Sequence, residues 1–348
     1  MTREELKLRQ MTNQHLLTPV STLCAVRDLC GVQAQFMSNA MHALKIRCYD
    51  FDAQNTAGLV KNWTIRGTVH VFAEADLPLF VRCCDGRDYR RNDWRGYTFW
   101  NQRDKWALTP ERQTFFADSI VSAVAEKSRS REELKQICRD IGMNEAEESS
   151  MFDSWGGGIR ELCERGFIHY AVQEEKVFAL TPAYTPMEEE AARLEIARRY
   201  FTHFAPAAIH DAMYFLGAKQ REVKSWLENL PVRSTECEGK TYYYIENGMA
   251  CTQDIPLCVF LAGFDPLMLG YQKKESLYLP DIHLRKIFNL AGIVMPAVLL
   301  RGNVVGRWKK KQTRLTVELF ETLSTSDRNL IADSAAALWE DLRKVEFA

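Results

Sequence analysis

The sequence contains none of the short motifs that mark common metal sites. It has no Cys-x-x-Cys pair and no His-Glu-x-x-His, although the chain has 10 cysteines and 7 histidines. Cys83 and Cys84 are adjacent, and the other cysteines are scattered, several of them through helical patterns. We therefore expect reduced thiols that pack as small apolar side chains of a cytosolic protein, with no metal and no cofactor.

Long apolar runs and an export signal are also missing. The longest apolar stretches, such as residues 292–300, are much shorter than the roughly 20 residues that cross a bilayer as a helix. Residues 1–5 lack the basic start and apolar run of a signal peptide. These absences predict a soluble cytoplasmic protein with no membrane partner.

An excess of positive charge is missing as well. The formal net charge is −1, so no overall basic field attracts nucleic acid, and any nucleic-acid surface must be local. One candidate, residues 301–314, has six cations and no acid. The other, residues 82–105, combines seven cations and four acids with aromatic residues. Cations beside aromatic rings suit DNA, although a solvated basic face over packed aromatics explains residues 82–105 equally well.

The chain is too long for a single hydrophobic core, and its hydrophobic content of 46% predicts globular structure throughout. Helical periodicity followed by a β-hairpin pattern occurs three times. This is the order of elements in a winged helix, a relative of the helix-turn-helix. We predict an α+β protein with winged-helix unit 1 and its aromatic-rich insertion (1–108), winged-helix unit 2 (109–184), winged-helix unit 3 (185–254), and a mostly antiparallel C-terminal β domain with a basic hairpin and a terminal helix (255–348).

Local signals predict several element boundaries. Thr18 is expected to cap a helix that Gly31 ends. Further signals are a cap at Thr109, a capping box from Ser130 to Glu133, hairpin arms at 167–172 and 176–180, Gly217 between two helices and a hairpin turn at Gly302-Asn303. Residues 56–62 are predicted as the third short helix of the first unit, directly before its hairpin. Residues 145–165 are predicted as one helix. Within it, Gly156-Gly157-Gly158 indicates either that another backbone packs closely or that the helix is broken, and close packing is the preferred interpretation.

Two neutral amides, Gln33 and Gln35, follow the first of these helices. In an extended segment, alternate side chains point to the same side. Two amides aimed together supply donors and acceptors without charge, which suits holding a water molecule or reading a base edge better than binding phosphate. A Gln-x-Gln pair taken alone is usually a pair of solvated loop residues, so its interpretation depends on its surroundings.

Four segments give the chain a resemblance to the AlkZ-like (YcaQ-like) DNA glycosylases over nearly its whole length. They are Val-Gln-Ala-Gln at 32–35, Arg-Gly-Thr-Val-His at 66–70, Phe-Asp-Pro-Leu-Met-Leu-Gly-Tyr at 264–271 and Arg-Gly-Asn-Val-Val-Gly-Arg-Trp at 301–308. The resemblance implies three tandem winged-helix units and a C-terminal β domain around a DNA-binding cleft. It also implies hydrolytic release of N-alkylated purines, with unhooking of interstrand crosslinks in some members. The family's catalytic Gln-x-Gln or Gln-x-Asp motif falls on Gln33 and Gln35.

Uncharged side chains suit this chemistry. An N7-alkylated guanine already carries positive charge, so it leaves the sugar without a strong general acid. A glutamine carbonyl can orient the attacking water. No lysine is assigned as a nucleophile, so we expect hydrolysis without strand cleavage. Asp50 and Asp265 are given no catalytic role, and Asp265 is expected to fix a turn.

The expected partner is double-stranded DNA with alkylated bases, bound by a monomer. The residues assigned to DNA binding are His70, Arg307, Lys309, Lys310, Lys311 and Arg314. A transcription regulator in which the glutamines read bases is the main alternative. The tandem arrangement in one chain argues against it, because such regulators usually dimerise on paired half-sites. A protein-interaction module that binds no DNA is supported only by the near-zero net charge.

Overall fold

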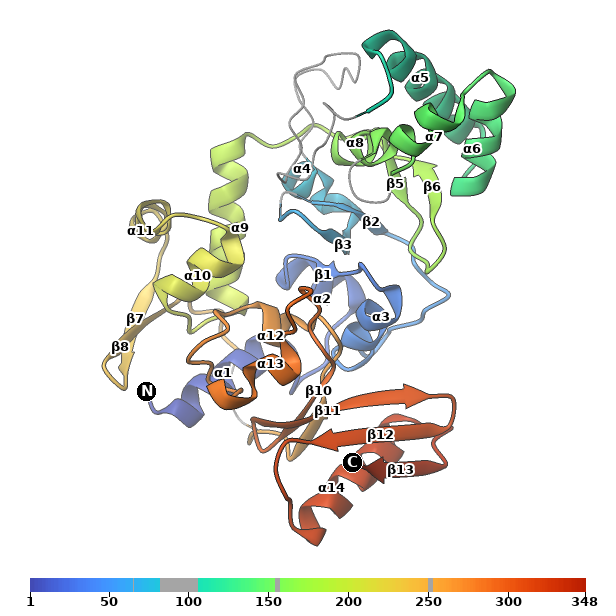
Figure 1. Ribbon diagram of the computed structural model, residues 1–348. Helices are drawn as coiled ribbons and strands as arrows, with labels where there is room; N and C mark the ends of the chain where they lie inside the picture. The colour runs from blue at the N-terminus through green and yellow to red at the C-terminus, as the bar shows by residue number, and fades with distance from the viewer. Residues whose placement is uncertain (65, 82–105, 154–156, 250–252) are drawn as a thin grey trace. The chain divides into compact units, whose positions relative to one another are not determined.

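The protein is a mixed α+β structure with antiparallel sheets, as predicted (Figure 1). The computed structural model describes residues 1–64, 66–81, 106–153, 157–249 and 253–348. These residues form unit 1 (1–33, 38–53 and 194–348) and unit 2 (34–37 and 54–193). The predicted domain boundaries after 108, 184 and 254 stay predictions. Residues 82–105, the second candidate nucleic-acid surface, lie outside the described residues. No helix in the described ranges is long and apolar enough to cross a membrane.

Unit 2 packs helices against antiparallel strands. Thr109 caps α5 through its side chain, and Ser130 with Glu133 forms the predicted capping box of α6. The strands lie in the order β3-β2-β5-β6-β4. The elements are β2 (Leu59–Trp63), β3 (Val69–Ala73), η1 (Glu74–Asp76), α4 (Leu77–Phe80), α5 (Pro110–Glu126), β4 (Arg129–Ser130), α6 (Arg131–Asp140), α7 (Glu145–Met151), α8 (Gly158–Glu164), β5 (Ile168–Tyr170) and β6 (Val177–Leu180).

Two helix predictions for unit 2 are wrong. Residues 56–62, predicted as a helix, contain most of strand β2, whose register with β3 runs from Leu59 opposite Ala73 to Trp63 opposite Val69. Pairing with β3 therefore overrides the local pattern. The single helix predicted for 145–165 is instead α7 and α8. A Cβ at Gly157 would lie only 2.7 Å from the Met151 carbonyl oxygen, so glycine allows these two backbone positions to approach closely.

The helices of unit 1 begin and end at identifiable signals. The helix predicted from Thr18 begins later, because Ser21 caps it and Val20 is extended in a bridge with Cys48. Gly217 has φ +62 and separates α10 from α11 as expected. The elements before residue 250 are α1 (Arg3–Asn13), α2 (Thr22–Asp28), β1 (Val32–Gln33), α3 (Met37–Lys45), α9 (Glu189–His203), α10 (Ile209–Leu216), α11 (Gln220–Glu228), β7 (Arg233–Cys237) and β8 (Lys240–Tyr244).

The last part of unit 1 is a sheet in the order β13-β12-β11-β10-β9. Its neighbours are antiparallel except β12 and β13. Residues of α14 pack on buried strand residues such as Val298 and Val317. The turn before β11 is Arg301-Gly302, one residue earlier than predicted, and both residues have positive φ. The elements are β9 (Cys258–Phe260), α12 (Pro266–Leu269), η4 (Asp281–His283), α13 (Leu284–Ile287), β10 (Ala297–Leu300), β11 (Asn303–Lys311), β12 (Arg314–Leu319), α14 (Thr325–Leu338) and β13 (Lys344–Phe347).

Candidate active site and nucleic-acid interface

The Gln-x-Gln segment follows a tight turn after α2. Cys30 and Gly31 have φ of +55° and +79°, which reverses the chain and starts β1 at Val32. Val32 and Ala34 are buried, whereas Gln33 is partly exposed and Gln35 is exposed. This is the alternation that an extended segment produces. The strand itself ends at Gln33, and Gln35 lies in the bend that leads into α3.

Neighbouring backbone helps to hold this segment in place. The Ala34 N–H donates to the Val69 carbonyl oxygen of β3 at 2.8 Å. Within the ranges that the structure describes, the carboxamides of Gln33 and Gln35 make no hydrogen bond to another protein group. Their donors and acceptors are therefore available to water or to a ligand.

His70 is enclosed beside this segment. Its side chain is 1% exposed, and Nδ1 lies 3.0 Å from the Thr68 carbonyl oxygen and 3.1 Å from the Thr64 hydroxyl. Burial lowers the pKa of His70 well below its usual value, and the charge of Arg66 lowers it further, so the ring is neutral at pH 7. The assignment of His70 to direct DNA contact disagrees with this burial, because an enclosed ring offers no surface to a duplex. The His70 ring instead stabilises the turn between β2 and β3 through its contacts with Thr64 and Thr68.

The basic hairpin β11–β12 has fewer unpaired cations than its sequence indicates. Carboxylates pair with three of its cations: Arg307 with Glu318 of the same hairpin at 2.6 Å, Lys310 with Asp341 at 2.7 Å and Arg314 with Glu346 at 3.8 Å. Lys309 and Lys311 are exposed and have no ion pair among the described residues. They alternate along β11, so their side chains lie on the same face of the sheet. Among the cations of this hairpin, these two lysines are the most available to phosphate.

One buried ion pair in unit 1 was not expected from the sequence. The guanidinium of Arg47 donates to both carboxylate oxygens of Asp265, at 2.7 and 3.0 Å, and both residues are 0% exposed. Arg47 also donates to the carbonyl oxygens of Gln14 and Ala43. The expectation that Asp265 fixes a turn is confirmed, because its carboxylate accepts the Leu267 N–H at the start of α12. No local pattern indicates a partner 218 residues away.

Comparisons with known proteins agree with this architecture. A family model described as "DNA glycosylase AlkZ-like" matches residues 26–340. A curated protein of Streptomyces sahachiroi, named "Interstrand DNA cross-link repair glycosylase", is 25% identical over 87% of this chain and 86% of its own length. The solved structure of Streptomyces sahachiroi DNA glycosylase AlkZ superposes with a TM-score of 0.75 at 21% identity and covers 100% of both chains, which shows a shared fold.

Proposed function

The chain belongs to the AlkZ-like DNA glycosylase family, and we propose that it hydrolyses the N-glycosidic bond of N-alkylated purines in double-stranded DNA. The observation that carries this proposal is the family match over residues 26–340, which contains both the Gln-x-Gln segment and the basic hairpin. Membership supports a DNA repair enzyme and does not support a transcription regulator. Because the similar Streptomyces protein is named for interstrand crosslink repair, crosslinked purines are included among the proposed substrates.

In this proposal, Gln33 and Gln35 position the attacking water. The C1′–N9 bond of an N7-alkylated guanine breaks, and its electron pair neutralises the positive purine ring, so no proton has to be supplied to the leaving base. Amide oxygens orient water beside C1′, where positive charge develops on the sugar. The water oxygen then bonds to C1′ and loses its proton to solvent. The accessibility of both amides and their unused hydrogen-bonding groups support these roles.

The order of elements supports winged-helix units. Helices α5 to α8 precede the hairpin β5–β6 in unit 2, and α9 to α11 precede β7–β8. In the first repeat, α1, α2 and α3 precede the hairpin β2–β3, so α1 supplies a third helix in place of the one predicted over residues 56–62. We assign all three repeats to the winged-helix type and propose that the chain acts as a cytoplasmic monomer on duplex DNA.

The two unpaired lysines predict the salt dependence of DNA binding. Lys309→Ser and Lys311→Ser should each weaken binding to all sequences and flatten the slope of log Kobs against log[salt] by about 0.9. The reason is that a protein with one phosphate contact fewer displaces fewer counterions from DNA. Lys310→Ser is the matched control. Because Asp341 already pairs with Lys310, the salt slope of this variant should change less than those of the other two. Fluorescence anisotropy with a labelled duplex at several salt concentrations measures these slopes. Unchanged slopes in both variants would place β11 away from DNA.

A base-release assay tests the enzymatic proposal itself. Duplex DNA that contains N7-methylguanine is incubated with the protein, and released base is separated by chromatography. We expect free N7-methylguanine, an abasic site and no strand break, because no lysine nucleophile is proposed. Unmodified duplex is the control and should release nothing. A sequence-specific footprint without release of damaged base would contradict the proposal and support the regulator.

A further inference from the structure

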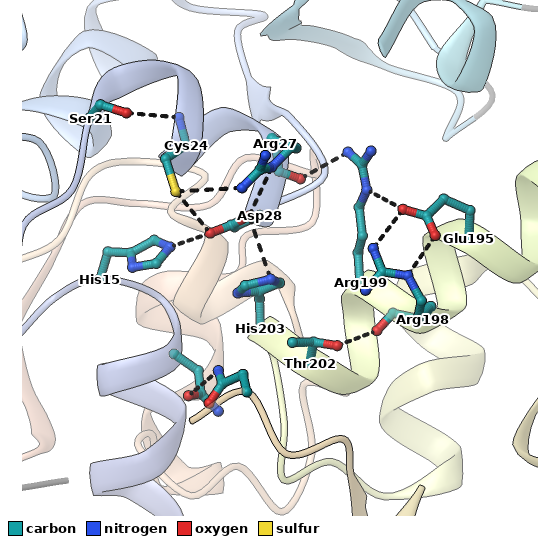
Figure 2. Close-up of polar contacts among 12 residues, drawn as sticks. His15, Ser21, Cys24, Arg27, Asp28, Glu195, Arg198, Arg199, Thr202 and His203 are labelled. Atoms are coloured by element: carbon teal, nitrogen blue, oxygen red, sulfur yellow. Dashed lines mark hydrogen bonds and ion pairs between the residues drawn. The ribbon is translucent and has the colours of Figure 1, made fainter. Parts of the chain in front are cut away.

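Four side chains that are able to bind a metal meet in unit 1 (Figure 2). Cys24 and Asp28 lie four residues apart on α2, so they project from one face of that helix. His15 follows α1, and His203 is the last residue of α9. Three chain segments, of which only that of His203 is distant in sequence, therefore converge on the carboxylate of Asp28.

The distances among these groups are close to those between ligands of one metal ion. His15 Nε2 lies 3.0 Å from Asp28 Oδ2, Cys24 Sγ lies 3.3 Å from the same oxygen, and His203 Nε2 lies 3.5 Å from Asp28 Oδ1. Ligand atoms of His15, Cys24 and Asp28 all lie within 4.8 Å of one another. In a tetrahedral zinc site, bonds of about 2.0–2.3 Å put neighbouring ligand atoms roughly 3.3–3.8 Å apart. His203 contacts Asp28 but lies outside that group of three, so it would complete the tetrahedron only after its ring moves closer to His15 and Cys24.

The ligand groups are largely shielded from solvent. The side chains of His15, Asp28 and His203 are 2%, 8% and 14% exposed. A bound metal would hold Cys24 as the thiolate.

We propose that His15, Cys24, Asp28 and His203 form a binding site for one Zn²⁺ ion. A thiolate, two imidazoles and a carboxylate are a donor set that favours zinc over Mg²⁺ or Ca²⁺, which prefer oxygen ligands. Four protein ligands fill a tetrahedral site, so the ion is structural and activates no water. Arg27, with Nε 3.3 Å from Asp28 Oδ1 and Nη2 3.8 Å from Cys24 Sγ, is the outer partner of the acidic ligands.

Through its bonds to the four ligands, the proposed ion would link α2 to the end of α1 and to the end of α9. Asp28 ends α2 five residues before Gln33, so the zinc would stabilise the segment that leads into the Gln-x-Gln strand. Folding and metal affinity would then be coupled, because the unfolded chain does not hold these four ligands together. This inference does not depend on the glycosylase activity.

Metal binding by the full-length protein tests the site. After treatment with a chelator and desalting, we expect the chain to take up one Zn²⁺, and Co²⁺ in its place to give a thiolate-to-cobalt charge-transfer absorption band. Zn²⁺ should also raise the Tm, whereas Mg²⁺ should not. Cys24→Ser should remove the cobalt band and weaken Zn²⁺ binding by more than about tenfold.

Two further variants make the result specific. Cys258→Ser replaces another partly buried cysteine, in β9, and should keep the band and the affinity of the wild type. His203→Gln should weaken Zn²⁺ binding while leaving thiolate absorption in place, and it serves as the second ligand variant if Cys24→Ser does not fold without metal. A wild-type chain that takes up no Zn²⁺, or uptake that survives both ligand variants, would overturn the proposal and leave a hydrogen-bonded cluster.

Discussion

Gln33→Ala and Gln35→Ala are each expected to slow base release from N7-methylguanine DNA by at least about 100-fold and to leave DNA affinity nearly unchanged. The reason is that the amides are proposed to act on the attacking water, whereas phosphate contacts supply most of the affinity. Both side chains are accessible and unused by the described protein groups, so their removal should not disturb folding. Single-turnover release assays and anisotropy measure the two effects separately.

A variant that keeps an acceptor oxygen at position 35 should retain base release. Gln35→Asp keeps an acceptor oxygen for the water and changes the motif to Gln-x-Asp, so it should release base far faster than Gln35→Ala. Gln136→Ala is the matched control, because Gln136 is an exposed glutamine on α6 that bonds only to Asp140 within the described chain. Wild-type release by both alanine variants of the motif would refute the proposed role of the two amides.

Arg47→Met is expected to lower the free energy of unfolding by about 3–5 kcal/mol, because it leaves the Asp265 carboxylate buried without its counter-charge. Urea unfolding at pH 7 measures this loss. The loss should be large because the two side chains are 0% exposed, so water cannot replace the missing partner.

A double-mutant cycle separates the pair from the packing of Arg47. Adding Asp265→Asn to Arg47→Met should cost much less than the sum of the two single losses, since the uncompensated charge is removed. Arg193→Met is the control: Arg193 pairs with Glu189 at 3.0 Å on a solvent-exposed part of α9, and its loss should cost less than about 1 kcal/mol. Equal losses for Arg47 and Arg193 would show that the buried pair contributes little.

The predictions that hold depend on short-range chemistry. The caps of α5 and α6, the left-handed glycine between α10 and α11 and the hairpin β5–β6 follow from side chains within a few residues of each other. The four segments that resemble the AlkZ-like family were likewise enough to indicate it, because a resemblance is recognised from the order of residue types along the chain. These features were determined by the sequence alone.

Tertiary structure decided the features that depend on distant partners. Strand β2 replaces a predicted helix because β3 pairs with it. Three cations of the β11–β12 hairpin form ion pairs with Glu318, Asp341 and Glu346. The burial of His70 and the convergence of His15 and His203 on Asp28 likewise come from packing. The sequence shows which side chains the protein has. Their burial and electrostatic pairing depend on which of them the fold brings within a few ångströms of one another.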